Sequence, residues 1–130
     1  MNLLVKEYFS LQEISNIWAV SRDDLLYYGE NNILEISVRP AAIAAGIERV
    51  CYNTEFANYL TEGKSQCFSP QPLLPTDIYR IMKAGTDAVP VYHTKYRFHE
   101  KISDIIENKG ILLSYTDLVV TRAEKHCFEI

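Results

Sequence analysis

The chain of 130 residues is long enough for one domain, or for a small N-terminal module packed on a slightly larger partner. Apolar residues make up 48% of it and charged residues 23%, a balance that supports a hydrophobic core and excludes global disorder. The net charge of −4 argues against a strong, non-specific binder of nucleic acid, because such proteins usually carry a basic face.

The cysteines Cys51, Cys67 and Cys127 are widely spaced and form no Cys-x-x-Cys pair. We therefore expect free thiols in a reducing compartment, with no disulfide, no metal site and no cofactor. The N-terminal apolar stretch is too short for a signal peptide. No run approaches the roughly 18 apolar residues that a membrane span requires. The expected location is the cytoplasm, with no membrane contact.

The first predicted elements are two short helices and a strand. Helices over 11–18 and 22–31 each follow a serine that can cap the backbone, with an acid three residues later. These pairs are Ser10 with Glu13 and Ser21 with Asp24. Apolar and polar residues then alternate over 33–39, which predicts a half-buried strand. A module boundary near Pro40 is expected, because the composition changes abruptly there.

The middle of the chain gives weaker signals. Short strands are possible interpretations of 48–53 and 65–69, and 55–64 fits either a helix or a loop. The proline-rich segment 69–75 reads as a connector. A helix over 77–84 follows, with Thr76 as its cap and Gly85 as its stop.

The remaining elements alternate between strands and a last helix. A strand is expected within 88–98, at a sheet edge or beginning near Pro90, because proline cannot donate to a ladder. Two short β-rich runs follow at 111–114 and 118–120. Thr121 and Glu124 form a third capping pair, which predicts a helix over 122–128. The expected fold class is α+β, with short antiparallel strands and a C-terminal helix.

The stretch from Phe9 to Arg39 resembles the excisionase-like branch of the MerR-type winged helix-turn-helix domains. The positions that carry the resemblance are Phe9, Ser10, Ile14 with Ser15, Ile17 with Trp18, Val20 with Ser21, Leu25, Tyr28 and Leu34. The segment 114–130 also resembles the tails of bacterial proteins that begin with such a module and are often linked to mobile elements. The resemblance implies a winged helix-turn-helix over 1–40 and a dimerisation or interaction part over 41–130. Ala19 and Asn32 stand where this family usually has glycine.

A tight core is expected inside the N-terminal unit, formed by Ile14, Ile17, Val20, Leu25, Tyr28 and Leu34. The outward positions of the second helix would be Arg22, Asp23, Leu26, Tyr27 and Glu30, with Asp24 engaged in the cap. In the resembled family these outward positions are rich in arginine and lysine, whereas Arg22 is the one basic residue among them here. Residues 1–40 carry a net charge of −3, which weakens attraction to phosphates.

A second candidate surface is basic and aromatic. Between residues 80 and 101 the net charge is +3, and tyrosine, histidine and phenylalanine lie among the cations. Such a pattern can track a phosphate backbone and stack bases, and it is also typical of a protein-facing strand. Its cations are Arg80, Lys83, Lys95, Arg97 and Lys101.

No pattern of catalytic residues is present, so we expect no enzymatic activity. His126 and Cys127 are neighbours on a predicted helix and would point about 100° apart. Asp104 and Glu107 fit a solvated face.

Two functions remain open. The first is a small DNA-binding transcriptional regulator or accessory factor, acting as a homodimer, with Arg22, Asp23, Tyr27 and Arg39 at the DNA. The alternative is a protein-interaction module that keeps the helix-turn-helix shape and contacts a partner through Leu26 and Tyr27.

Overall fold

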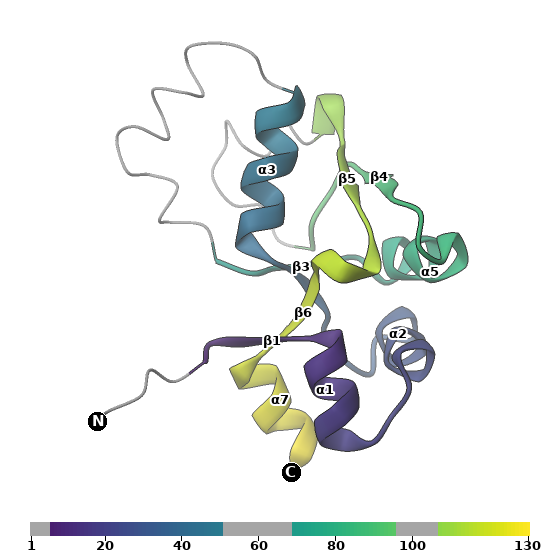
Figure 1. Cartoon of the computed structure of the whole chain (residues 1–130), viewed down its shortest axis with the longest axis vertical. Helices are drawn as coiled ribbons and strands as arrows, with labels where there is room; N and C mark the ends of the chain where they lie inside the picture. The colour runs from purple at the N-terminus through teal and green to yellow at the C-terminus, as the bar shows by residue number, and fades with distance from the viewer. Residues whose placement is uncertain (1–5, 51–68, 96–106) are drawn as a thin grey trace.

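The computed structural model describes residues 6–50, 69–95 and 107–130 (Figure 1). Short antiparallel strands and helices alternate along them, and the chain ends in a helix, which confirms the predicted α+β class. The strands are β1 (Tyr8–Ser10), β2 (Ser37–Val38), β3 (Gln71–Pro72), β4 (Val89–Val91), β5 (Ile111–Leu113) and β6 (Leu118–Thr121). The helices include α1 (Leu11–Trp18), α2 (Arg22–Glu30), α3 (Pro40–Val50), α5 (Pro75–Ala84) and α7 (Arg122–Glu129), with a 3₁₀ turn at Tyr115–Asp117.

The main sheet has the strand order β1-β6-β2-β3, and β4 pairs with β5 in a second sheet; all pairs are antiparallel. Val119 of β6 lies opposite Ser10 on one side and Ser37 on the other. A strand from the C-terminal part of the chain therefore lies between two strands that precede residue 40. Residues 6–40 and the described part of 41–130 share one sheet and one hydrophobic core.

Two strands of this sheet continue directly into capped helices. β1 leads into α1, where the Ser10 hydroxyl accepts from the Glu13 N–H and the Glu13 carboxylate accepts from the Ser10 N–H. β6 leads into α7, where the Thr121 hydroxyl accepts from the Glu124 N–H. The Ser10–Glu13 capping pair is confirmed in both halves. Thr121 caps α7 as predicted, but the Glu124 carboxylate accepts from the Glu35 N–H rather than from the Thr121 N–H. Because β1 and β6 are antiparallel, α1 and α7 begin at opposite ends of this strand pair. The two helices nevertheless lie side by side (Figure 1), with Trp18 of α1 stacked on Phe128 of α7.

The turn between α1 and α2 uses the left-handed conformation. Ala19 has φ 54°, and its neighbour Val20 donates its N–H to the carbonyl of Ser15. Asn32, after α2, also has a positive φ of 58°. These are the two positions at which the resembled family has glycine. Asparagine tolerates this conformation better than alanine does, so Ala19 is the more strained of the two.

The predicted strand over 33–39 is shorter in the structure, because only Ser37 and Val38 pair as a strand. Leu34, Ile36 and Val38 are buried as the alternation predicts, but Ser37 is buried too. β2 lies between β6 and β3, so neither of its edges is free.

Three predictions in the middle of the chain need correction. The segment 69–75 is more than a connector, because it contains β3. Residues 48–50 belong to α3 rather than to a strand. Helix α5 begins at Pro75 rather than after a Thr76 cap, since proline suits the first helical position. The predictions for 51–53, 55–64 and 65–68 lie outside the described residues.

The core differs from its predicted composition at two positions on the helices. Leu25, Ile14 and Leu34 are buried, and Val20 and Tyr28 pack against the core, as expected. Ile17 is 52% exposed, because the sheet and α2 cover the opposite side of α1. Leu26, predicted to face outward, is only 2% exposed.

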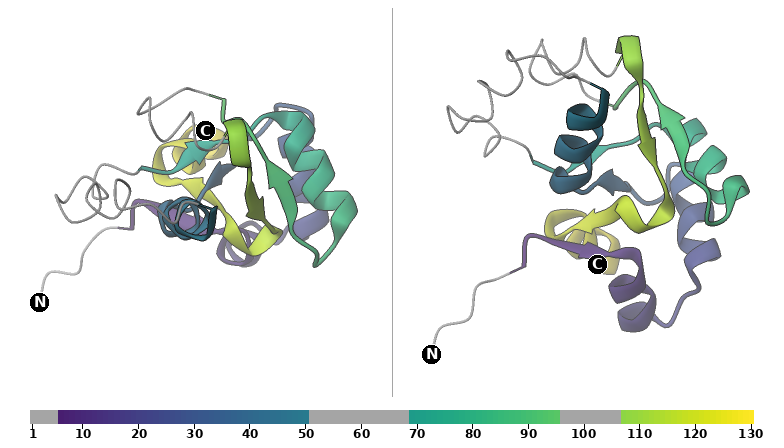
Figure 2. Two further views of the ribbon diagram at one scale, coloured as in Figure 1. Left: turned by 90° about the horizontal axis from the view of Figure 1, so that it is seen from above. Right: turned by 45° about the horizontal axis from the view of Figure 1, so that its top comes forward.

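Leu26 is buried because a second helix covers α2. α5 packs along α2, as both views of Figure 2 show. Gly29 is buried at this contact: a Cβ there would lie 2.6 Å from Ile36 Cδ1 and 3.1 Å from Ile78 Cγ2. The absence of a side chain at residue 29 therefore lets α2 approach Ile36, just before β2, and Ile78 of α5 closely.

Candidate interaction surface

The outward face of α2 is acidic. Asp23, Asp24 and Tyr27 are exposed, and Glu30 is half-buried at the end of the helix. The Ser21 hydroxyl accepts from the Asp24 N–H, so the cap engages the backbone of Asp24 rather than its carboxylate. The prediction that the Asp24 side chain is spent on the cap is therefore wrong. Its charge adds to the negative face.

Arg22, the cation of α2, is held at the side of this face. Its guanidinium lies 3.9 Å from the centre of the Tyr115 ring, and its Nε lies 3.9 Å from Asp23 Oδ1. Stacking on an aromatic ring and pairing with a carboxylate both favour this position of the guanidinium. A phosphate ligand would have to compete with these two contacts.

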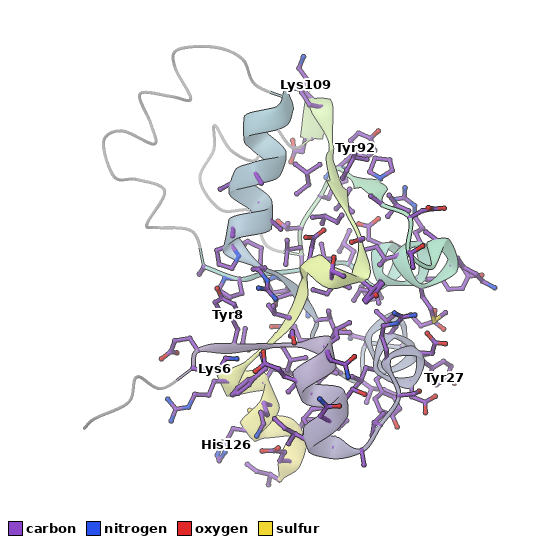
Figure 3. All side chains as sticks on the ribbon, in the orientation of Figure 1. Lys6, Tyr8, Tyr27, Tyr92, Lys109 and His126 are labelled. Atoms are coloured by element: carbon purple, nitrogen blue, oxygen red, sulfur yellow. The ribbon has the colours of Figure 1, made fainter. Side chains whose placement is uncertain are left out.

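Arg39 lies elsewhere, at the junction of β2 and α3. Its side chain is half-buried, and its Nε is buried without a hydrogen-bond partner. It lines a cavity of about 230 Å³ together with Lys6, Glu7 and Tyr8. Lys6 and Tyr8 lie on the side of the view opposite to Tyr27 in Figure 3. The structure therefore does not bring Arg22 and Arg39 together with Tyr27 on one face.

A row of aromatic rings crosses three helices beside the acidic face. Tyr27 contacts Tyr28 at 6.4 Å between ring centroids, Tyr28 contacts Phe128 at 6.0 Å, and Phe128 stacks on Trp18 at 4.7 Å. Trp18 Nε1 also donates to the carboxylate of Glu129 over 2.7 Å. Tyr27 is 53% exposed at the outer end of this row and points away from the fold (Figure 3).

Leu26 and Tyr27 were both expected to contact a partner, and the structure corrects this expectation for Leu26. Tyr27 is available to a partner, whereas Leu26 faces the interior. Position along the helix explains the difference: α5 covers one side of α2, and adjacent residues point about 100° apart. Sequence reasoning missed the aromatic row as a unit, because it joins residues more than 100 positions apart. Only the apolar spacing of Trp18 and of Phe128 on their own helices indicated these rings.

Two carboxylates in this part of the molecule are held ionised by their neighbours. Hydrogen bonds from Lys125 and from Trp18 hold the pKa of Glu129 below its ordinary value. Those from Lys6 and from the Ser10 N–H lower the pKa of Glu13. Glu124 is anchored differently, since its Oε1 accepts from the Glu35 N–H over 3.0 Å. The Trp18–Glu129 bond joins α1 to α7, and the Glu35–Glu124 bond joins α7 to the segment that precedes β2.

The basic residues of 80–101 do not form one free cationic surface in the described part. Arg80 pairs with Asp77 at 2.9 Å, and the Lys83 ammonium lies 5.5 Å from the Tyr79 ring centre. Lys95 lies 3.4 Å from Glu35, and its N–H donates to the carbonyl of Pro72. Arg97 and Lys101 lie outside the described residues.

A second hollow lies between the end of α2 and the start of α5. It measures about 370 Å³ and is lined by Glu30, Asn31, Pro75, Thr76, Tyr79 and Arg80. The buried Oε2 of Glu30 accepts no hydrogen bond. An unpaired buried carboxylate oxygen loses its hydration without a compensating contact, which makes Glu30 an unusual feature of this surface.

Other classes of site find no support in residues 6–50, 69–95 and 107–130. No three His, Cys, Asp or Glu residues gather there as metal ligands. Helices of the length and apolarity needed to cross a membrane are also absent from these ranges. Cys127 is exposed as a free thiol, while Cys51 and Cys67 lie outside the ranges.

No protein-family model matches the chain, and neither the curated proteins nor the solved structures give a significant match.

Proposed function

We propose that this chain is a protein-interaction module in which α1 and α2 form an excisionase-like helix-turn-helix that contacts a protein partner. The contact surface would be the outward face of α2, centred on Tyr27. The observation that carries this proposal is the chemistry of that face. It exposes Asp23, Asp24 and an aromatic ring, while Arg22 is engaged with Tyr115 and Asp23.

Physical chemistry supports a protein rather than a nucleic acid as the partner. Each carboxylate that faces a phosphate backbone removes attraction and adds repulsion. Tyrosine, by contrast, is enriched at protein interfaces, where its ring is buried and its hydroxyl keeps a polar contact. The row of rings behind Tyr27 supports its position against the fold.

Photo-crosslinking tests this proposal. With p-benzoylphenylalanine in place of Tyr27, irradiation of cells should give a discrete protein adduct that mass spectrometry can identify. An adduct of twice the chain mass would identify the homodimer that the sequence favours. The matched control carries the crosslinker in place of Tyr92, which is 40% exposed on β4.

The same crosslinking chain with Asp23→Arg and Asp24→Arg should lose the adduct, because both substitutions reverse the charge of the contact face. Adducts of equal yield from positions 27 and 92, or no adduct from position 27, would contradict the proposal.

A DNA-binding regulator is the second candidate. Its support is the arrangement of α1, a tight turn and α2, with the outer side of α2 left open to solvent. In this function Tyr27 and Asp23 would face the major groove, and Arg22 and Arg39 would have to leave their present positions to reach phosphates. A chain with this function would be located in the cytoplasm and would act in transcription.

Titration on random-sequence duplex separates the two candidates. At about 50 mM salt we expect no measurable binding by the wild-type chain, because the face over α2 repels phosphates. Asp23→Arg should raise the affinity, while Asp87→Arg, the same charge change beyond α5, should not. Fluorescence anisotropy of a labelled duplex is the measurement. Tight wild-type binding with a steep salt dependence would favour the regulator instead.

A further inference from the structure

The hollow between α2 and α5, defined above by its six lining residues, adjoins the proposed contact face. Glu30 and Asn31 come from the end of α2, and the others come from the first turns of α5. Its volume of about 370 Å³ is sufficient for one long side chain. Asn31 donates its side-chain amide to the carbonyl of Tyr27 over 2.8 Å, so the hollow begins one helical turn from Tyr27.

The charges around this hollow are unevenly compensated. Arg80 is neutralised by Asp77, which is only 8% exposed and lies 2.9 Å from the Arg80 guanidinium. Lys83 lies against Tyr79 and does not line the hollow. Glu30 makes no ion pair with any described residue, and its Oε2 is buried without a hydrogen bond. The uncompensated charge at the hollow is therefore the negative charge of Glu30.

A cation that enters the hollow would satisfy this carboxylate. The last torsion of a glutamate side chain rotates easily, so the carboxylate can turn toward an incoming donor. The exposed ring of Tyr79 adds an aromatic wall, which attracts ammonium and guanidinium groups. The Thr76 hydroxyl, exposed at the edge, can accept a further hydrogen bond.

We propose that this hollow binds a lysine or arginine side chain of the protein partner, with Glu30 as its counter-ion. The inference rests on the proposed function and names the chemistry of the partner: a basic segment lying along α2. Charge complementarity supports this occupant, because Asp23 and Asp24 extend the negative surface along the same helix. The partner's cation would occupy the hollow while its neighbouring residues cover Tyr27.

Solution NMR of the full chain tests the hollow without knowledge of the partner. The probes are N-acetyl-lysine-methylamide and N-acetyl-arginine-methylamide, with N-acetyl-norleucine-methylamide as the uncharged analogue. We expect saturable shifts of the backbone amides of Glu30, Asn31, Thr76 and Tyr79 with at least one cationic probe, and none with norleucine. Equal shifts with norleucine, or no saturation with either cation, would overturn the inference.

Two variants sharpen the test. Glu30→Gln should weaken the cationic probe by about tenfold or more, as expected when one member of a charge-assisted hydrogen bond becomes neutral. Asp87→Asn, which removes a charge outside the hollow, should leave the affinity unchanged. The dispersion of the amide spectrum verifies that each variant is folded. If both variants weakened binding of the cationic probe equally, the overall charge of the chain would explain the effect, and the assignment to Glu30 would be overturned.

The source of the cation and the proposed function are tested separately. Spermidine that binds the hollow more tightly than the amino-acid probes would overturn the assignment to a protein side chain. Crosslinking at Tyr27 without occupancy of the hollow would leave the protein-interaction proposal standing and overturn this inference alone. A hollow that binds the probes, in a chain that gives no adduct at Tyr27, would mean that the proposed function fails while the cation site remains.

Discussion

Replacement of Leu25 by alanine is expected to lower the free energy of unfolding by about 2–5 kcal/mol. Leu25 has no exposed surface and lies in the core that α1 and α2 share with the main sheet. The substitution removes the transfer free energy of the lost methyl groups and leaves a cavity that the neighbouring residues fill only in part. Urea denaturation followed by circular dichroism measures the change.

Ile17→Ala is the matched control for this substitution. Both residues are apolar positions of the predicted N-terminal core, but Ile17 is 52% exposed on the outer side of α1. Its replacement should change the free energy of unfolding by about 0.5–1 kcal/mol at most, because little buried surface is lost. Equal losses for Leu25→Ala and Ile17→Ala would contradict the placement of α1 against the sheet.

Removal of β6 and α7 is expected to have a still larger effect. A chain that ends at Asp117 loses Leu118, Val119 and Val120, which are fully buried, and leaves β1 and β2 without their shared neighbour. Burial of three such side chains contributes roughly 5–9 kcal/mol, which is comparable to the whole stability of a small domain. Thermal unfolding should therefore lose its cooperative transition, and near-ultraviolet circular dichroism should lose its aromatic signal.

The control for this truncation lacks only Ile130, which is 92% exposed and should not contribute to the fold. It should unfold cooperatively at the temperature of the full chain. A chain ending at Asp117 that still unfolds cooperatively would show that residues 6–40 hold together without β6. That result would also support an independent N-terminal module.

Local signals predicted the starts of three helices, whereas α3 was not predicted. Ser10, Ser21 and Thr121 each precede apolar residues at helical spacing, and α1, α2 and α7 begin directly after them. Capping depends on residues within one turn, so it can be read from a short window. The runs at 111–114 and 118–120 likewise became β5 and β6.

The candidate site was predicted less completely, because it depends on which side of each helix is covered. Tyr27 was correctly assigned to the outer face, but Leu26 was not, since α5 packs against it. Arg22 and Arg39 were expected together on one DNA-contacting surface. Arg22 is instead stacked on Tyr115, and Arg39 is half-buried at another cavity. The unpaired carboxylate of Glu30 gave no signal in the sequence, because its environment comes from residues 75–80.

The sequence by itself determined the α+β class, the starts of three helices, the acidic character of α2 and the exposure of Tyr27. These properties follow from residue type, from capping and from a periodicity of 3.6 or 2, all of which act over a few residues. Only the tertiary structure decided that β6 pairs between β1 and β2, and that Trp18, Tyr28 and Phe128 form one row. Strand order and helix packing join residues up to about a hundred positions apart, and hydrophobic patterning shows which face is buried but not which partner buries it.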